Sequence, residues 1–203
     1  METNRMIVDG TEEKIDAALS EAERFAEYQG LDDKAARRIR LLAEEMMGMV
    51  RGITGDFTAY FWVEGTKEKC SLRLRAKTKL DLNKREELIK SSTSKKNSAY
   101  KGLGGKIREL FEIMGESYND VVKYDPSVGM YSAPSEGMVF ISQGGSDWSL
   151  SRYRQVLSDQ KEEDESLNKE WDALERSVLA KLADEVKVGI KDGTVDVVVE
   201  KKL

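Results

Sequence analysis

Residues 31–79 read LDDKAARRIRLLAEEMMGMVRGITGDFTAYFWVEGTKEKCSLRLRAKTK, and this stretch decides the fold. Its first half predicts a helix over Leu31–Arg51, because apolar residues recur there at spacings of three and four. These residues form one stripe: Ala35, Ile39, Leu42, Met46, Met49 and Val50. Asp32 or Asp33 is the expected N-cap, since a short acidic side chain there accepts from the first free amides.

The second half of the stretch predicts a β-hairpin. Gly52 and Gly55 are expected to end the helix, because glycine tolerates the left-handed backbone of a helix stop. Phe57–Val63 and Cys70–Ala76 then alternate apolar with polar residues around a short polar turn. The sequence therefore predicts two antiparallel strands with one buried face, on which the helix lies.

Composition limits the classes of function. The 203 residues are 35% charged with a net charge of −5, which disfavours general nucleic-acid binding because that needs a basic field. No apolar run reaches the roughly 20 residues of a membrane span, and the start lacks a signal-peptide pattern, so we expect a cytoplasmic protein. Cys70 is the single cysteine and histidine is absent, which excludes internal disulfides, histidine catalysis and cysteine-cluster or histidine metal sites.

The flanking sequence extends the same organisation. Met6–Val8 predicts an edge strand, and a first helix is expected to stop near Gly30. Near the end of the sequence, two alternating valine-rich runs flank Asp192-Gly193, which is the strongest short hairpin signal. We expect one α+β domain over residues 1–203, with an antiparallel-rich mixed sheet covered by helices on one face.

Two segments depart from this pattern. Residues 115–150 hold both prolines and have no period, so we interpret them as a long insertion, either a lid or a disordered loop. Residues 151–170 are polar and helix-prone, and we expect a polar helical extension there.

A glycine-rich turn is the first candidate binding site. Glycines at the start of a helix let backbone amides approach an anion, and nearby lysines add positive charge. The candidate nucleotide- or phosphate-binding residues are Lys95, Lys96, Asn97, Lys101, Gly102, Gly104 and Gly105. The alternative is an ordinary glycine-rich loop with solvated lysines, since short glycine motifs recur widely.

Glu44 and Glu45 are the second candidate. A carboxylate on a helix that faces a sheet can act as a general base toward water. The alternative is a pair of surface glutamates bound to Arg37, Arg38 or Arg40 on the same helix.

The third candidate is a surface for a protein partner. Tyr60 and Trp62 alternate with Phe61 and therefore lie on the opposite face of the hairpin, beside basic residues of the next strand. Cys70 falls on the apolar side, so it is expected to be a core residue rather than a nucleophile.

These elements together resemble the GHKL ATPase superfamily, with the nearest likeness to the small anti-sigma-factor serine kinases. Leu42–Glu45 stands where the family has its Leu-Ala-x-Glu-type segment, and Gly102–Ile107 is similar to its last glycine box. The resemblance implies a two-layer sandwich of helices on a sheet. The magnesium-holding Asn of the family would fall at Gly48 or Met49, and Asp81–Arg85 lacks the glycines of the adenine-reading motif.

Because phosphoryl transfer needs metal and a positioned triphosphate, these departures predict a regulatory or pseudo-ATPase domain without strong catalysis. We expect a protein partner and no metal, while ATP or ADP as a ligand and a homo-oligomer stay open. A pure interaction module is the alternative. An enzyme of unknown class with Glu44 or Glu45 as base is a third reading. If the GHKL-like domain is itself active, it would be an ATP-dependent serine kinase or ATPase.

Overall fold

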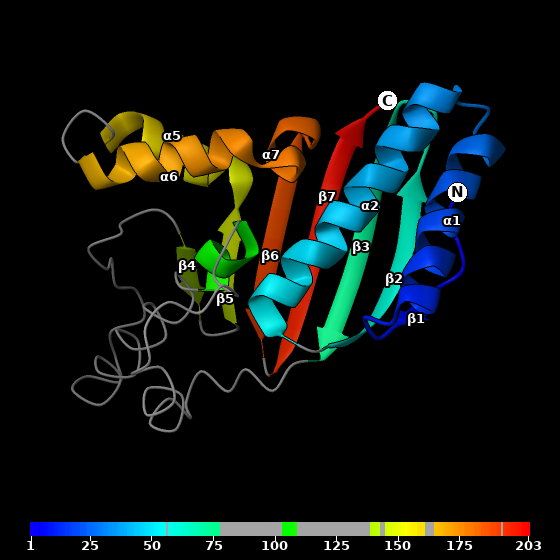
Figure 1. Ribbon diagram of the computed structural model, residues 1–203, viewed down its shortest axis with the longest axis horizontal. Helices are drawn as coiled ribbons and strands as arrows, with labels where there is room; N and C mark the ends of the chain where they lie inside the picture. Colours follow the sequence, from blue (N-terminus) through cyan, green and yellow to red (C-terminus); the bar gives the residue numbers. More distant parts are fainter. Residues whose placement is uncertain (56, 78–102, 109–138, 143–144, 161–164, 192) are drawn as a thin grey trace.

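A computed structural model describes residues 1–55, 57–77, 103–108, 139–142, 145–160, 165–191 and 193–203. Its strands are β1 (Met6–Val8), β2 (Thr58–Gly65), β3 (Lys69–Lys77), β4 (Val139–Ser142), β5 (Gly145–Ser149), β6 (Glu185–Lys191) and β7 (Thr194–Lys202). They form one antiparallel sheet in the order β1-β2-β3-β7-β6-β5-β4 (Figure 1). The sheet centre is the long pairing of β3 with β7.

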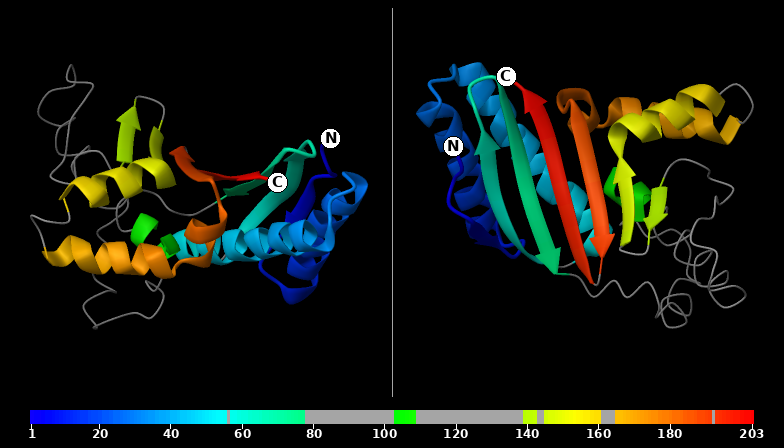
Figure 2. Two further views of the ribbon diagram at one scale, coloured as in Figure 1. Left: turned by 90° about the horizontal axis from the view of Figure 1, so that it is seen from above. Right: turned by 180° about the vertical axis from the view of Figure 1, so that it is seen from behind.

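Helices cover one face of this sheet. They are α1 (Glu12–Tyr28), α2 (Asp33–Thr54), α5 (Leu150–Gln160), α6 (Glu165–Arg176) and α7 (Val178–Leu182), and residues 103–108 are helical as well. Seen from behind, the strands have no described helix over them (Figure 2, right). The described chain is thus an α+β arrangement of an open antiparallel sheet and a helical layer.

The helix predicted over Leu31–Arg51 is present, with shifted ends. The Ala35 amide donates to Asp32 Oδ1 at 2.7 Å, so Asp32 is the N-cap of α2. Gly52 does not end the helix, which continues to Thr54. Gly55 ends it with a φ of +74°, a conformation that glycine adopts without steric cost.

The core lies between the two layers. Both predicted hairpins pair as expected, β2 with β3 and β6 with β7. The inward strand positions, among them Phe61 of β2 and Leu74 of β3, form an apolar face. This face packs with buried residues of α1 and α2, including Phe25, Ile39 and Met46. α1 contacts β1 and β2, whereas α2 contacts β7 and runs diagonally across the middle strands of the sheet (Figure 1).

The interpretation of residues 115–150 as an insertion is wrong at its C-terminal end. Residues 139–142 and 145–149 form β4 and β5, which extend the sheet beyond β6. Residues 109–138, which include both prolines, lie outside the described residues, as do residues 78–102.

The segment expected as a polar extension belongs to the core. Tyr153 and Leu157 of α5 are buried, and Tyr153 contacts the ring of Trp148 with centroids 5.7 Å apart. α6 and α7 are separate helices, because Ser177 caps α7 and accepts a hydrogen bond from the Ala180 amide.

Candidate functional site

Most of the glycine-rich candidate site falls outside the described residues. This applies to Lys95, Lys96, Asn97, Lys101 and Gly102. Gly104 and Gly105 are described, both buried, in the helical segment 103–108.

Gly104 lies against the backbone of α2. A Cβ added there would stand 2.3 Å from the carbonyl oxygen of Met49, and one added at Gly52 would stand 3.2 Å from Gly104 backbone atoms. Real side chains do not tolerate the first distance, so the two helical segments cross this closely only because residue 104 is glycine, while the contact at Gly52 is merely tight. Close helix packing therefore accounts for Gly104, whether or not an anion also binds near it.

Glu44 and Glu45 occupy different environments. Glu44 is exposed, whereas Glu45 is half-buried. Burial, followed by the negative charge of Glu44, raises the pKa of Glu45. The alternative, in which these glutamates bind arginines of the same helix, is not seen among the described residues, because Arg40 binds Glu23 and Asp16 of α1, and Arg37 reaches only Asp33.

A half-buried carboxylate with a raised pKa is suited to accept a proton. Neither glutamate has a hydrogen-bond or ion-pair partner in the part of the chain that the structure describes. A perturbed carboxylate alone does not define a reaction, so this position stays a weak candidate. Cys70 is a buried free thiol, as expected, and burial raises its pKa to about 12.

The uncovered sheet face, here called the open face, is the best-defined candidate surface. Its side chains stand in rows across the strands, because each register pair aligns two outward positions. One row contains Ile7, Tyr60, Arg75, Asp196, Gly189 and Asp147. The next contains Trp62, Arg73, Val198, Lys187 and Ser149, and a third contains Glu64, Ser71, Glu200 and Glu185.

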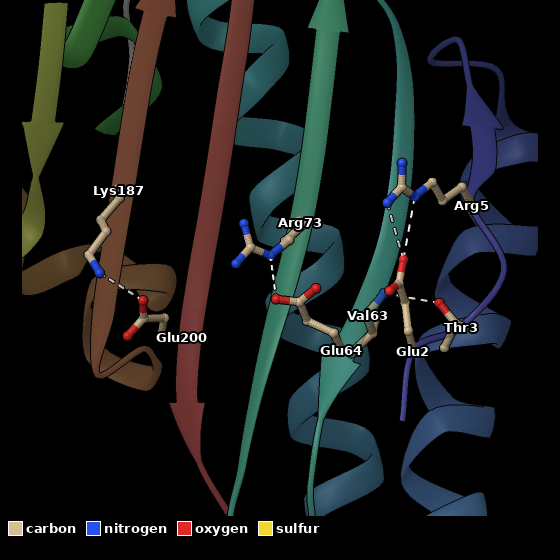
Figure 3. A network of polar contacts seen from close by, with 8 residues as sticks. All are labelled: Glu2, Thr3, Arg5, Val63, Glu64, Arg73, Lys187 and Glu200. Carbon is tan, nitrogen blue, oxygen red and sulfur yellow. Dashed lines mark hydrogen bonds and ion pairs between the residues drawn. The ribbon is translucent and has the colours of Figure 1, made fainter.

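Ion pairs connect the second row, which contains Arg73 and Lys187, to the third row, which contains Glu64 and Glu200. Arg73 Nε donates to Glu64 Oε1 at 2.6 Å, and Lys187 Nζ donates to Glu200 Oε1 at 2.8 Å (Figure 3). Within the first row, Arg75 binds Asp196 at 2.6 Å, and this hydrogen bond raises the pKa of Arg75. Exposed pairs of this kind contribute little stability, typically about 0–1 kcal/mol each, so their main effect is to fix side-chain positions.

The two aromatic residues expected on this face, Tyr60 and Trp62, differ in exposure because the N-terminal segment covers only Trp62. Tyr60 and its register partner Ile7 are each 52% exposed and form an apolar patch. Trp62 is only 8% exposed, because the guanidinium of Arg5 lies 4.7 Å from its ring centroid. Sequence alternation placed Trp62 on this face correctly but could not show that Arg5 covers it.

A depression on the open face surrounds Gly189. It measures about 340 Å³ and lies between Asp147 and Asp196, the two register partners of this glycine. Because Gly189 has no side chain, Asp147 leans over it, with Oδ1 3.0 Å from where a Cβ would stand. Sequence reasoning missed this feature, although the period-2 position of Gly189 within a valine-rich strand was a usable signal.

Two classes of site find no support in the described ranges. No group of three or more acidic or cysteine side chains there is arranged to hold a metal ion. Within the same ranges, every helix is too short or too polar to cross a membrane. Comparison with known proteins adds no assignment, since no family model, curated protein or solved structure matches the chain.

Proposed function

We propose that the chain is a regulatory domain of the GHKL type that binds a protein partner and has no strong catalytic activity. The observation that carries the proposal is the open face. It is a broad sheet surface with no described helix over it, and it presents the exposed Tyr60–Ile7 pair beside fixed ion pairs. Exposed aromatic residues with a polar surround are typical of protein-binding surfaces.

The order of elements supports the GHKL part of the proposal. A first strand, two helices and a hairpin precede the glycine-rich segment, and a final hairpin follows it. Gly48 and Met49, where the resemblance requires a magnesium-holding Asn, support the absence of strong catalysis. The proposal is distinct from a pure interaction module only if a nucleotide or phosphate also binds at Gly102–Gly105.

Photocrosslinking tests the partner surface. A benzophenone amino acid replaces Tyr60 in one variant and Tyr28, which is 74% exposed on α1, in a matched control. We expect crosslinked protein adducts in cells of the source organism from position 60 and not from position 28. Equal adducts from both positions, or adducts from position 28 alone, would contradict the proposed surface.

Nucleotide titration tests whether the chain binds a nucleotide and whether it lacks strong catalysis. A ligand present at 100 times its Kd raises the free energy of unfolding by about 2.7 kcal/mol, which a thermal-shift assay detects. We expect a small shift with ATP or ADP that does not require magnesium. The absence of any shift at millimolar nucleotide leaves the interaction module as the function, whereas magnesium-dependent turnover would overturn the claim of weak catalysis.

A further inference from the structure

A second surface lies on the helical layer, on the other side of the molecule from the open face. A groove of about 390 Å³ runs between the N-terminal half of α2 and α7. Its lining, here called the basic groove, consists of Asp33, Lys34, Arg37, Arg38, Leu41 and Leu182. Three cations thus surround two leucines in a protein whose net charge is negative.

These cations stand where α2 itself disfavours them. The N-terminal end of a helix carries a partial positive charge, which repels cations and attracts anions. Lys34 lies in the first turn of α2, and Arg37 and Arg38 lie in the second. Helix formation therefore gives no reason for three basic residues here, and acidic residues would serve it better.

The cations are also largely uncompensated. Lys34 and Arg38 have no hydrogen-bond or ion-pair partner among the residues that the structure describes. Arg37 reaches Asp33 only at 4.0 Å, between side chains that are 78% and 95% exposed. Arg40, on the other side of the helix, is by contrast bound by two carboxylates of α1.

An apolar strip accompanies the charge. Leu41 of α2 is 36% exposed, and Leu182 of α7 is half-buried in the groove. Val178, on the same short helix α7, is 38% exposed. A small anion would be bound by the cations alone and would leave these side chains in water.

We propose that the basic groove binds an acidic segment of a partner protein, with an apolar side chain of that segment placed against Leu41 and Leu182. Charge complementarity selects the occupant, because carboxylates would neutralise the three cations of the groove. The apolar strip separates such a segment from a free anion or a nucleic-acid backbone. This surface is independent of the open face, so either can fail without the other.

The test uses the full chain and a defined probe. The probe is a fluorescein-labelled peptide of about 12–15 residues, made of glutamate with leucine at helical spacing, beside a twin in which lysine replaces every glutamate. Fluorescence anisotropy measures affinity at low and physiological salt. We expect the acidic peptide to bind, its affinity to fall with salt, and the lysine twin not to bind.

Two double variants of equal charge localise the binding. Arg37→Glu with Arg38→Glu reverses the groove, and Arg24→Glu with Arg176→Glu reverses two exposed arginines elsewhere. We expect the groove variant to lose at least about tenfold in affinity and the control to change little. Circular dichroism and Tm confirm that both fold. Equal losses in the two variants would show that only net charge matters, and failure of the native chain to bind would overturn the site.

A third variant tests the apolar part. Leu41→Ser keeps every charge and removes half of the apolar strip. We expect weaker binding of the peptide by this variant and unchanged binding of polyglutamate to the groove. If the peptide binds the variant as tightly as the native chain, the groove is a general anion surface, which contradicts an acidic segment with an apolar side chain.

Discussion

At the scale of single residues, burial sets the chemistry of Cys70. Burial raises the pKa of its thiol to about 12, with the nearby charges of Lys201 and Asp184 as smaller, opposing influences. At pH 8 a thiol of this kind is ionised to roughly one part in ten thousand, against about a quarter for an ordinary cysteine. We expect a thiol reagent to label the folded protein about a thousandfold more slowly than the unfolded protein.

Timed labelling with mass spectrometry, in buffer and in denaturant, measures this ratio. Free glutathione in both samples is the control for the reagent. Rapid stoichiometric labelling of the folded chain would show that the start of β3 around Cys70 opens readily.

Glu45 gives a prediction with a defined pH dependence. Its pKa is higher in the folded protein than in the unfolded chain, so the folded state holds the proton to higher pH and stability falls as pH rises between the two values. Glu45→Gln removes this loss. We therefore expect the variant to be more stable than the native protein at pH 7 and equally stable below roughly pH 4.

Urea denaturation at several pH values tests the Glu45 prediction. Glu44→Gln is the matched control and should give a smaller gain, because Glu44 is exposed. Destabilisation by Glu45→Gln at pH 7 would instead indicate a favourable interaction of the charged carboxylate.

At the scale of elements, replacing two glycines of the helical layer by alanine should change the stability of the protein in opposite directions. Gly48 is exposed in the middle of α2 with no atom within 4 Å of an added Cβ, so Gly48→Ala should stabilise by about 0.5–1 kcal/mol through helix propensity. Gly104→Ala would clash with the Met49 carbonyl and should destabilise by about 1–3 kcal/mol, or detach the 103–108 segment.

The denaturant midpoints of the Gly48→Ala and Gly104→Ala variants test these opposite stability changes. Gly52→Ala is expected to give an intermediate result. The added Cβ at position 52 stands at 3.2 Å, which a small shift can accommodate. Equal midpoints for the Gly104 and Gly48 variants would show that the two helical segments do not pack closely in solution.

Periodicity predicted the elements that carry an uninterrupted pattern. The stripe of α2 and the alternation of β2, β3, β6 and β7 were visible because one face of each is buried. β4 and β5 were missed because both are short, at four and five residues, and β5 is mostly glycine, serine and aspartate. β5 also pairs with β6 only through tertiary structure. The open face was predicted at Tyr60, whereas Arg5 over Trp62 and the Gly189 depression depend on register, which sequence spacing does not reveal.

At the scale of the whole molecule, stability should fall from the middle of the sheet toward its edges. β3 and β7 are paired on both sides, whereas β1 and β4 are short edge strands. Amides that exchange only by global unfolding are expected in the best-paired, most buried strands. We predict the slowest hydrogen exchange in β3 and β7, intermediate rates in β6, and the fastest strand exchange in β1 and β4.

Hydrogen–deuterium exchange with mass spectrometry resolves these segments. Exchange in unfolded chain under the same conditions corrects for intrinsic rates. Protection of β4 equal to that of β7 would show that the sheet opens as one unit, against the graded order predicted here.

The pairing of β3 with β7 also bears on how the chain reaches this structure. The salt bridge between Arg75 and Asp196 joins positions 121 residues apart, and the whole central ladder has a similar separation. Closing so long a loop before its contacts form is slow, so folding on the order of milliseconds to seconds is expected, with the ladder forming late. Until then β3 and β7 present unpaired edges beside apolar faces, and the nascent chain is most exposed to aggregation in that interval.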